Sequence, residues 1–248
     1  MNNLIITWLS GDTSNLPETM VFFKSLEDVG FQGDKVILTN DLPFNESYLM
    51  SLDWQIVKLD FKNTDYYDLL RNRWHAFYKY LIQSEKSYKR VVISDSRDVL
   101  FQDLSFLKHP GVNLVCEGFL HQDSSWNYND QMDLQFHLKT RIPCLNWPVL
   151  NGGFQVGDHL DMINFCKNFS IACAFAPAGT YTDQAILNYM YNTICVDDRD
   201  IHFPQESNLC LTGEGVKNGI VGLSYSSYSV FHQWDRTVYK DIILDKYK

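Results

Sequence analysis

Two carboxylates follow a short apolar run in the segment Arg90–Gln102, which reads RVVISDSRDVLFQ. The β-branched residues Val91–Ile93 predict a buried strand. Asp95 and Asp98 come directly after it. In open α/β sheets, ligands bind beyond the carboxyl ends of the strands, and carboxylates held together there repel each other unless a cation neutralises them. The spacing therefore predicts a site for Mg²⁺ or Mn²⁺, with phosphate oxygens as further ligands.

A structural explanation of the same residues stays open. Asp and Ser favour caps and turns, so Asp95 and Asp98 could close a turn without binding anything. Arg97, which lies between them, would then form a surface ion pair.

A pair of adjacent glycines interrupts a later apolar segment, Leu150–Gly157, which reads LNGGFQVG. Glycines inside a strand indicate a bulge or a close approach of the backbone to a ligand. An ordinary hairpin turn is the alternative, because Asn-Gly is a strong hairpin signal. Asn151, Gly152 and Gly153 are therefore candidates for the wall of a pocket.

Two further segments contain residues with a possible chemical role. TDQAILN, over Thr182–Asn188, predicts a helix start at which Asp183 either favours the helix dipole or faces a ligand beside Gln184. FHQWDR, over Phe231–Arg236, contains a histidine that is either structural or a metal ligand, since imidazole binds transition metals well.

In this order the segments resemble the GT-A superfamily of nucleotide-sugar glycosyltransferases. They are most similar to the family 8 branch, which includes galactosyltransferases and glycogenin. The resemblance extends from Asn3 to about Arg236, and the run Ser-Asp-Ser-Arg-Asp-Val followed by Phe-Gln is its most specific part. It implies one GT-A (Rossmann-like) domain over residues 1–248, with a central mixed, mostly parallel sheet flanked by helices. It also implies a metal-dependent transfer of a sugar from a nucleoside diphosphate sugar, expected to be a UDP-sugar, to the hydroxyl of a carbohydrate or glycan acceptor.

The resemblance assigns roles to particular residues. The metal ligands would be Asp95, Asp98 and His232, and the groups facing the reacting sugar would be Asp183 and Gln184. The donor would be bound by Thr7, Trp8 and Leu9 at the base, and elsewhere by Arg73, Asp95, Asn151, Gly152, Gly153 and Arg236.

The sequence also departs from the family pattern. The acids have the spacing Asp-x-x-Asp, and the lysine-containing segment that follows the late histidine in family 8 is absent, so Arg236 would replace that lysine on the diphosphate. An inverting reaction needs a base that removes the proton from the acceptor hydroxyl. Asp183 is the first candidate, and Asp123 and Asp130 are alternatives. Trp126 and Tyr128, between those two, could stack on a sugar ring.

Two other classes of function remain to be considered. A haloacid dehalogenase-type phosphohydrolase also has acids after an apolar strand, but it needs Asp-x-Asp, and residue 97 is Arg. A non-catalytic sugar-binding module would suit the 15% aromatic content, but would not require an acidic pair and a late histidine.

Composition limits the setting and the partners. The 248 residues carry a formal net charge of −9, which argues against a nucleic-acid partner. No stretch approaches the ~20 apolar residues that span a bilayer, and no signal peptide is evident. The six cysteines match no zinc spacing and are expected to be buried thiols in a cytoplasmic protein, with disulfides as the alternative.

The predicted elements that position these residues alternate between strands and helices, which indicates an α/β layered sheet. Helices are expected over Tyr66–Gln83, His159–Phe175 and Thr182–Tyr191, and from Pro17 to Gly30. A polar loop is expected over Gln122–Asp130, before a helix over Gln131–Thr140. Strands are expected over Asn3–Leu9, Lys35–Thr39, Trp54–Leu59, Val91–Ile93 and Asn113–Cys116, and the resemblance implies a further strand at the glycine pair within Val149–Val156.

Overall fold

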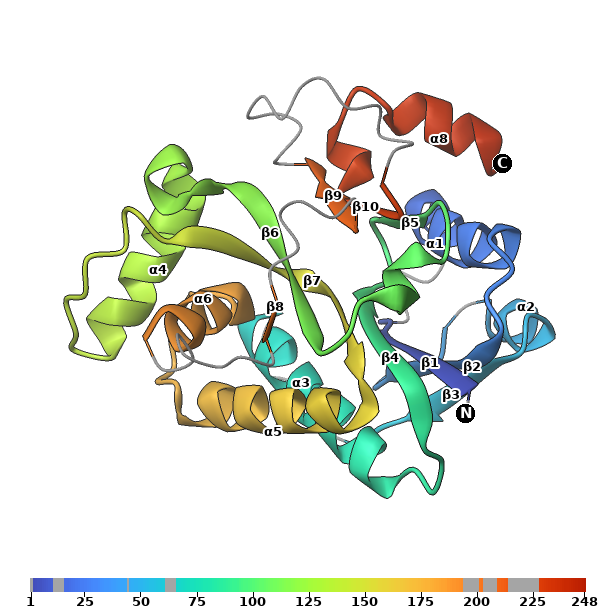
Figure 1. The fold of residues 1–248 in the computed structure, drawn as a ribbon, viewed down its shortest axis with the longest axis horizontal. Helices are drawn as coiled ribbons and strands as arrows, with labels where there is room; N and C mark the ends of the chain where they lie inside the picture. Colours follow the sequence, from blue (N-terminus) through green and yellow to red (C-terminus); the bar gives the residue numbers. More distant parts are fainter. Residues whose placement is uncertain are drawn as a thin grey trace.

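A mixed β-sheet with helices on both faces forms the centre of the computed structural model (Figure 1). The structure describes residues 2–10, 16–43, 45–60, 66–193, 201–202, 209–213 and 228–248. The strands of this sheet are β1 (Asn2–Trp8), β2 (Gly33–Thr39), β3 (Trp54–Lys58), β4 (Tyr88–Asp95), β6 (Val112–Leu120), β7 (Pro148–Asp158) and β8 (Ile201–His202). Their order is β3-β2-β1-β4-β7-β6-β8. β7 runs antiparallel to both of its neighbours, and the other pairings are parallel, so the predicted mixed α/β sheet is confirmed.

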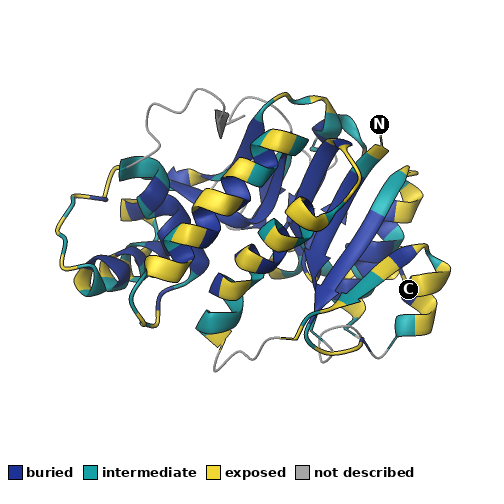
Figure 2. Cartoon of the chain, turned by 90° about the horizontal axis from the view of Figure 1, so that it is seen from below, coloured by how far each residue is buried: buried dark blue, intermediate teal, exposed yellow. Residues whose placement is uncertain are grey.

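The two faces of the sheet are covered by different helices. Leu4 and Ile6 of β1 pack into a core with α3 (Tyr66–Gln83), α5 (His159–Phe175) and α6 (Asp183–Thr193). Ile5, the residue between them, packs on the opposite face with α1 (Pro17–Asp28). Because both faces are buried, the strands read as continuous apolar runs instead of alternating ones. Figure 2 shows the buried strands beneath helices whose outer surfaces are exposed.

The predicted helices over Tyr66–Gln83 and His159–Phe175 are confirmed at both ends. A short helix, α2 (Glu46–Ser51), was not predicted. The prediction of a polar loop over residues 122–130 is wrong, because α4 (Ser125–His137) begins inside it. The side chain of Ser124 caps this helix by accepting a hydrogen bond from the Asn127 N–H. The inward face of α4 carries polar side chains, including the buried Gln131 and Gln135, so no apolar periodicity marks the helix in the sequence.

The glycine pair lies inside a strand. β7 is continuous, so a hairpin turn at Asn151 is excluded. Its pairing with β6 changes register between Leu114, which lies opposite Gln155, and Val115, which lies opposite Asn151. The residues of β7 between Asn151 and Gln155, which include both glycines, form a bulge. A bulge was the alternative to a hairpin turn in the sequence analysis of this segment.

A second, three-stranded sheet lies beside the first. It consists of β5 (Val99–Phe101), β9 (Cys210–Thr212) and β10 (Val230–His232), in the order β5-β10-β9. β10 runs antiparallel to β5 and pairs His232 with Val99. The C-terminal helix α8 (Lys240–Lys246) packs with this sheet and with α1 through a small core that includes Phe231. This pairing brings the late histidine to the turn that follows β4.

None of the described helices is long and apolar enough to cross a membrane. No disulfide joins the cysteines in the described ranges, and Cys195 lies outside those ranges.

Candidate metal centre and its cavity

The two acids of the first motif lie at the carboxyl end of a central strand. Asp95 is the last residue of β4, and Asp98 immediately precedes β5. The turn between them is tied to β1, because Ser96 Oγ donates a hydrogen bond to the Trp8 carbonyl over 2.9 Å. The prediction that the acids occupy this edge of the sheet is confirmed.

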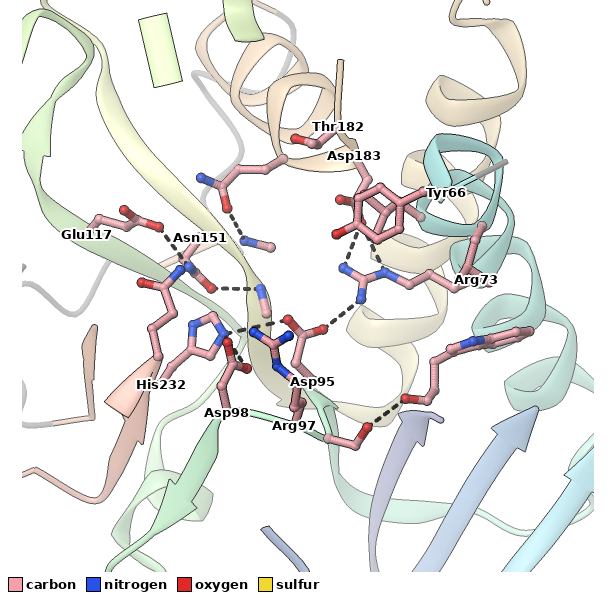
Figure 3. Close-up of a pocket in the computed structure, with 18 of the residues that line it drawn as sticks. Tyr66, Arg73, Asp95, Arg97, Asp98, Glu117, Asn151, Thr182, Asp183 and His232 are labelled. Atoms are coloured by element: carbon pink, nitrogen blue, oxygen red, sulfur yellow. Dashed lines mark hydrogen bonds and ion pairs between the residues drawn. The ribbon is translucent and has the colours of Figure 1, made fainter. Parts of the chain in front are cut away.

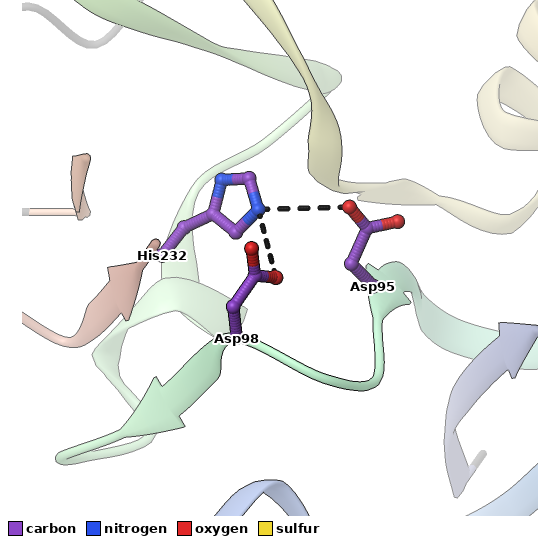
Figure 4. Close-up of side chains that lie close together, drawn as sticks. All are labelled: Asp95, Asp98 and His232. Carbon is purple, nitrogen blue, oxygen red and sulfur yellow. Dashed lines mark ion pairs between the residues drawn. The ribbon is translucent and has the colours of Figure 1, made fainter. Parts of the chain in front are cut away.

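His232 joins the two acids from the second sheet (Figure 4). Its Nε2 lies 3.6 Å from Asp95 Oδ2 and 3.3 Å from Asp98 Oδ1. A backbone hydrogen bond of 2.7 Å from Gln233 N to the Asp98 carbonyl holds the two segments together. His232 and Asp98 are buried, while Asp95 is partly exposed.

This cluster fits a divalent cation. One ligand atom from each residue lies within 4.8 Å of the others. Two donors that share an ion at about 2.1 Å can be up to about 4.2 Å apart, so both histidine–carboxylate distances are compatible with one shared ion. In the described part of the chain, the ring nitrogens of the buried His232 have no hydrogen bond of normal geometry, and Nε2 has only its ion-pair contacts with Asp95 and Asp98. Buried polar atoms are normally hydrogen-bonded, so this imidazole is suited to bind an ion that it shares with the two carboxylates.

The charges of the cluster depend on one another. Burial by itself would raise the pKa of Asp95, but Arg73 and then His232 hold it at about 2. Burial would likewise lower the pKa of His232, but Asp98 and Asp95 raise it to about 10. Without a metal the two acids therefore keep a proton on the imidazole, and a metal would take the place of that proton.

An arginine joins the cluster to a third acid (Figure 3). Arg73 Nη1 of α3 donates to Asp95 Oδ1 over 2.6 Å, and its Nε and Nη2 donate to Asp183 Oδ2 over 3.1 and 2.8 Å. The indole Nε1 of Trp74 donates to the same Asp183 oxygen over 2.7 Å. Asp183 is buried at the start of α6. Three donors on one oxygen hold this carboxylate in a fixed orientation.

Amide side chains form another wall of the site. Asn151 Nδ2 donates to the buried carboxylate of Glu117 over 2.8 Å, and its Oδ1 accepts from Gly153 N over 2.7 Å. Gln184 Oε1 accepts from Gly152 N over 3.2 Å, and its Nε2 donates to Asn127 Oδ1 over 2.9 Å. The bulge in β7 therefore turns the glycine backbone towards α6.

Apart from Trp74, these groups line one cavity of about 530 Å³, which is large enough for a small organic ligand. The cavity brings together most of the predicted site residues: Trp8, Arg73, Asp95, Asp98, Asn151, Gly152, Gly153, Asp183, Gln184, His232 and Arg236. Thr7 and Leu9 do not line it. Thr7 Oγ1 instead donates to the Ser94 carbonyl over 2.6 Å, and Leu9 is buried in the core beside α1.

The sequence interpretation missed several lining residues, among them Tyr66, Arg97, Glu117 and Asn127. Arg97 had a signal, since it lies between the two acids, but it was interpreted only as a surface ion pair. Glu117 lies within β6, and no local pattern distinguishes it from other charged residues near a strand end.

Asp123 and Asp130, the alternative candidates for the catalytic base, do not line the cavity. Asp130 accepts hydrogen bonds from Thr182 N over 3.0 Å and from Thr182 Oγ1 over 2.6 Å. Asp123 accepts from the backbone N–H of Leu120 over 3.0 Å. Of the two aromatic residues in that segment, the exposed Trp126 lines the cavity and Tyr128 does not.

In comparisons with known proteins, no family model matches this sequence and no curated protein matches it.

Proposed function

We propose that this chain is a metal-dependent glycosyltransferase of the GT-A type, which moves a sugar from a nucleoside diphosphate sugar to an acceptor hydroxyl. One observation carries the proposal. Asp95, Asp98 and His232 converge at the carboxyl end of a central strand, inside a cavity of about 530 Å³. Ligands bind at this edge in open α/β sheets. The donor is proposed to be a UDP-sugar on the basis of the family resemblance.

The three ligands would hold Mn²⁺ or Mg²⁺. Two carboxylates and one imidazole suit Mn²⁺ better than Mg²⁺, which strongly prefers an all-oxygen shell. A bound divalent cation would stabilise the negative charge that develops on the departing diphosphate.

Asp183 would act on the transferred sugar. Cleavage of the glycosidic bond leaves positive charge on the sugar, and a fixed carboxylate nearby stabilises that charge. Arg73 and Trp74 hold Asp183 Oδ2, which orients the carboxylate before a substrate arrives. Gln184 would bind sugar hydroxyls from the same helix start, beside the backbone of Gly152.

The function is tested by incubating the purified chain with a panel of nucleotide sugars and Mn²⁺, and by measuring nucleotide release with and without EDTA. We expect release from a UDP-sugar that stops when EDTA is added. The Asp98→Asn variant should lose it as well, because its amide replaces an anionic metal ligand.

Two results would contradict the proposal in different ways. Release of phosphate from simple phosphate esters, with no turnover of any nucleotide sugar, would indicate a phosphohydrolase. Sugar binding that is unaffected by EDTA, again without turnover, would indicate a non-catalytic binding module.

A further inference from the structure

Helix α4 turns apolar residues outwards. Its buried side is mainly polar, as described above. Its outer side carries Trp126, Met132 and Phe136, whose exposed fractions are 57%, 38% and 77%. With Asn129 they form one stripe, because residues three or four apart lie on the same side of a helix. This is the reverse of the usual arrangement, in which the apolar side of a helix faces the core, so the outer stripe takes no part in the core of this chain.

The segment after α4 extends this surface. It runs back beside the helix (Figure 1), with Ile142 N donating to Gln135 Oε1 over 2.7 Å and Gln122 N donating to the Leu145 carbonyl over 3.0 Å. Leu145, which is 48% exposed, therefore lies near the start of α4. We call the exposed residues of the helix and this segment the α4 surface: Ser125, Trp126, Asn129, Met132, Phe136, Lys139, Arg141, Pro143, Leu145 and Asn146.

The charge of the α4 surface is opposite to that of the whole chain. The chain has 30 acidic and 21 basic residues, but the α4 surface contains Lys139 and Arg141 and no acid. The two acids within the inner half of α4, Asp130 and Asp133, instead accept hydrogen bonds from threonines that precede α6. The α4 surface is therefore apolar and cationic, which suits an anionic partner.

Lys139 occupies a position where a helix commonly has glycine. Its φ is +57°, in the left-handed region, and its N–H donates to the Phe136 carbonyl over 3.1 Å just after α4 ends. Glycine is common at such a position because it has no Cβ atom. A lysine in this conformation is uncommon, and a residue kept in a less favourable conformation indicates a function for its side chain. Here the side chain adds a positive charge at the end of the apolar stripe.

We propose that the α4 surface docks this chain on a bilayer that contains anionic lipids. Exposed aromatic and aliphatic side chains enter the boundary between headgroups and acyl chains, and lysine and arginine attract anionic headgroups. Trp126 also lines the cavity, so the docked surface is continuous with the candidate site. An acceptor held in the same membrane would reach the cavity from this side. The role in acceptor delivery rests on the proposed function, whereas the docking itself does not.

A second copy of this chain fits the α4 surface less well. In a twofold dimer the same patch meets itself, so Lys139 and Arg141 of both copies would come together on a surface that has no acid to neutralise them. A stable interface also involves about 20–30 residues on each side, which is more than the α4 surface offers. An anionic bilayer supplies both the apolar layer and the negative charge.

Vesicle sedimentation tests the proposal with the full chain and without any substrate. We expect the chain to pellet with vesicles of phosphatidylcholine and phosphatidylglycerol in equal parts, and much less with vesicles of phosphatidylcholine alone. Phe136→Ser should weaken binding to the mixed vesicles about tenfold, because a large apolar side chain no longer leaves water. Lys139→Gln combined with Arg141→Gln should weaken it about twentyfold at low salt, since each cation adds to the attraction.

Two changes on α5 serve as matched controls. Leu160→Ser and Lys167→Gln alter exposed residues outside the α4 surface, so both variants should bind vesicles as the wild type does. Circular dichroism verifies the fold of every variant. Any nucleotide release measured in solution should be unchanged by Phe136→Ser, because Phe136 does not line the cavity.

The outcomes separate the docking surface from the proposed function. Wild-type protein that stays in the supernatant with the mixed vesicles would overturn the docking proposal, and so would equal losses in the α4 and control variants. A dimer in analytical ultracentrifugation that Phe136→Ser dissociates, without vesicle binding, would assign the surface to a second copy instead. Vesicle binding that depends on the α4 surface, in a chain that releases no nucleotide, would support the docking and contradict only the proposed function.

Discussion

The backbone of Gly153 packs directly against the candidate metal ligands. A Cβ atom built at this position would lie 2.5 Å from His232 Nε2 and 2.7 Å from Asp95 Oδ2, which are the atoms that would bind the metal. A Cβ atom at the neighbouring Gly152 would lie 3.8 Å from the nearest side-chain atom of Gln184, an ordinary contact. The two glycines therefore have different reasons to lack a side chain, although they are adjacent in the sequence.

We predict that Gly153→Ala abolishes Mn²⁺ binding and that Gly152→Ala retains it. The methyl group at residue 153 occupies the space between His232 and Asp95, whereas the one at residue 152 meets only ordinary van der Waals neighbours. Calorimetric titration of Mn²⁺ into each variant makes the comparison, with circular dichroism to verify the fold. Equal affinities in the two variants would show that the cluster is not the metal site.

Helix α4 is fixed to the start of α6 by a row of polar contacts. Asn127, Asp130 and Asp133 follow one another at intervals of three residues on α4. They contact Gln184, Thr182 and Thr180 respectively. Asp130 and Asp133 each accept hydrogen bonds from both the backbone N–H and the hydroxyl of one threonine. Because Thr182 directly precedes Asp183, this row determines where the proposed reacting group lies.

Replacing the two acids of α4 should separate positioning from stability. Asp130→Ala and Asp133→Ala each remove a carboxylate that accepts two hydrogen bonds from one threonine, and Asp133→Ala also removes a contact with His137, so we expect both variants to lose stability. Only Asp130 holds the residue next to Asp183, so Asp130→Ala should lower kcat about tenfold or more with little change in the KM for the donor. Steady-state kinetics and thermal denaturation of both variants test this. An equal effect on kcat in the two variants would indicate a purely structural role.

The contribution of Asp130, which contacts Thr182, to the stability of the protein depends on pH. Burial raises the pKa of Asp130 to about 6, compared with 3.8 for a free carboxyl, although the hydrogen bonds from Thr182 act in the opposite direction. The folded protein therefore binds this proton more tightly than the unfolded chain does. The contribution to stability is fully present below about pH 4 and is lost as the pH rises through about 6. A carboxyl-carbon NMR titration should show Asp130 titrating near pH 6, and a midpoint near 4 would contradict the prediction.

At the scale of the whole molecule, the candidate metal site joins two sheets. Asp95 and Asp98 follow a strand of the large sheet, and His232 lies on the small one, so only the native fold assembles the three ligands. A ligand that binds only the native state stabilises it by mass action. Mn²⁺ should therefore raise the melting temperature of the protein.

The shift in melting temperature depends on how far the Mn²⁺ concentration exceeds Kd. At a free Mn²⁺ concentration of 100 times Kd, the native state is stabilised by about 2.7 kcal/mol. For a chain of this length each kcal/mol raises the melting temperature by about 2–4 °C, so we expect about 5–10 °C. EDTA should reverse the shift, and Asp98→Asn should remove it. A wild-type protein whose melting temperature does not respond to saturating Mn²⁺ would refute a site built from both sheets.

The sequence by itself determined the local features. Apolar runs and helical spacing placed the main strands and the helices over Tyr66–Gln83 and His159–Phe175. Acidic residues after a buried strand indicated where a metal and an anion could bind, because the carboxyl edge of an α/β sheet is where ligands gather. The inferences about strands and helices succeeded because burial imposes a periodic pattern on neighbouring residues. The predicted helix over Gln131–Thr140 overlaps the end of α4, but the start of α4 escaped prediction because its inward face is polar and carries no such pattern.

The tertiary structure alone decided which of these residues meet. The pairing of β10 with β5 brings His232 to Asp98, and Arg73 reaches both Asp95 and Asp183 from a helix on one face of the sheet. The tertiary structure also placed Thr7 in the sheet interior and turned Asp130 towards Thr182 instead of the cavity. Such contacts join segments far apart in the chain, and they form because the whole core packs in one arrangement. No local pattern of side chains records them, so residues that could do chemistry were visible in the sequence while their geometry was not.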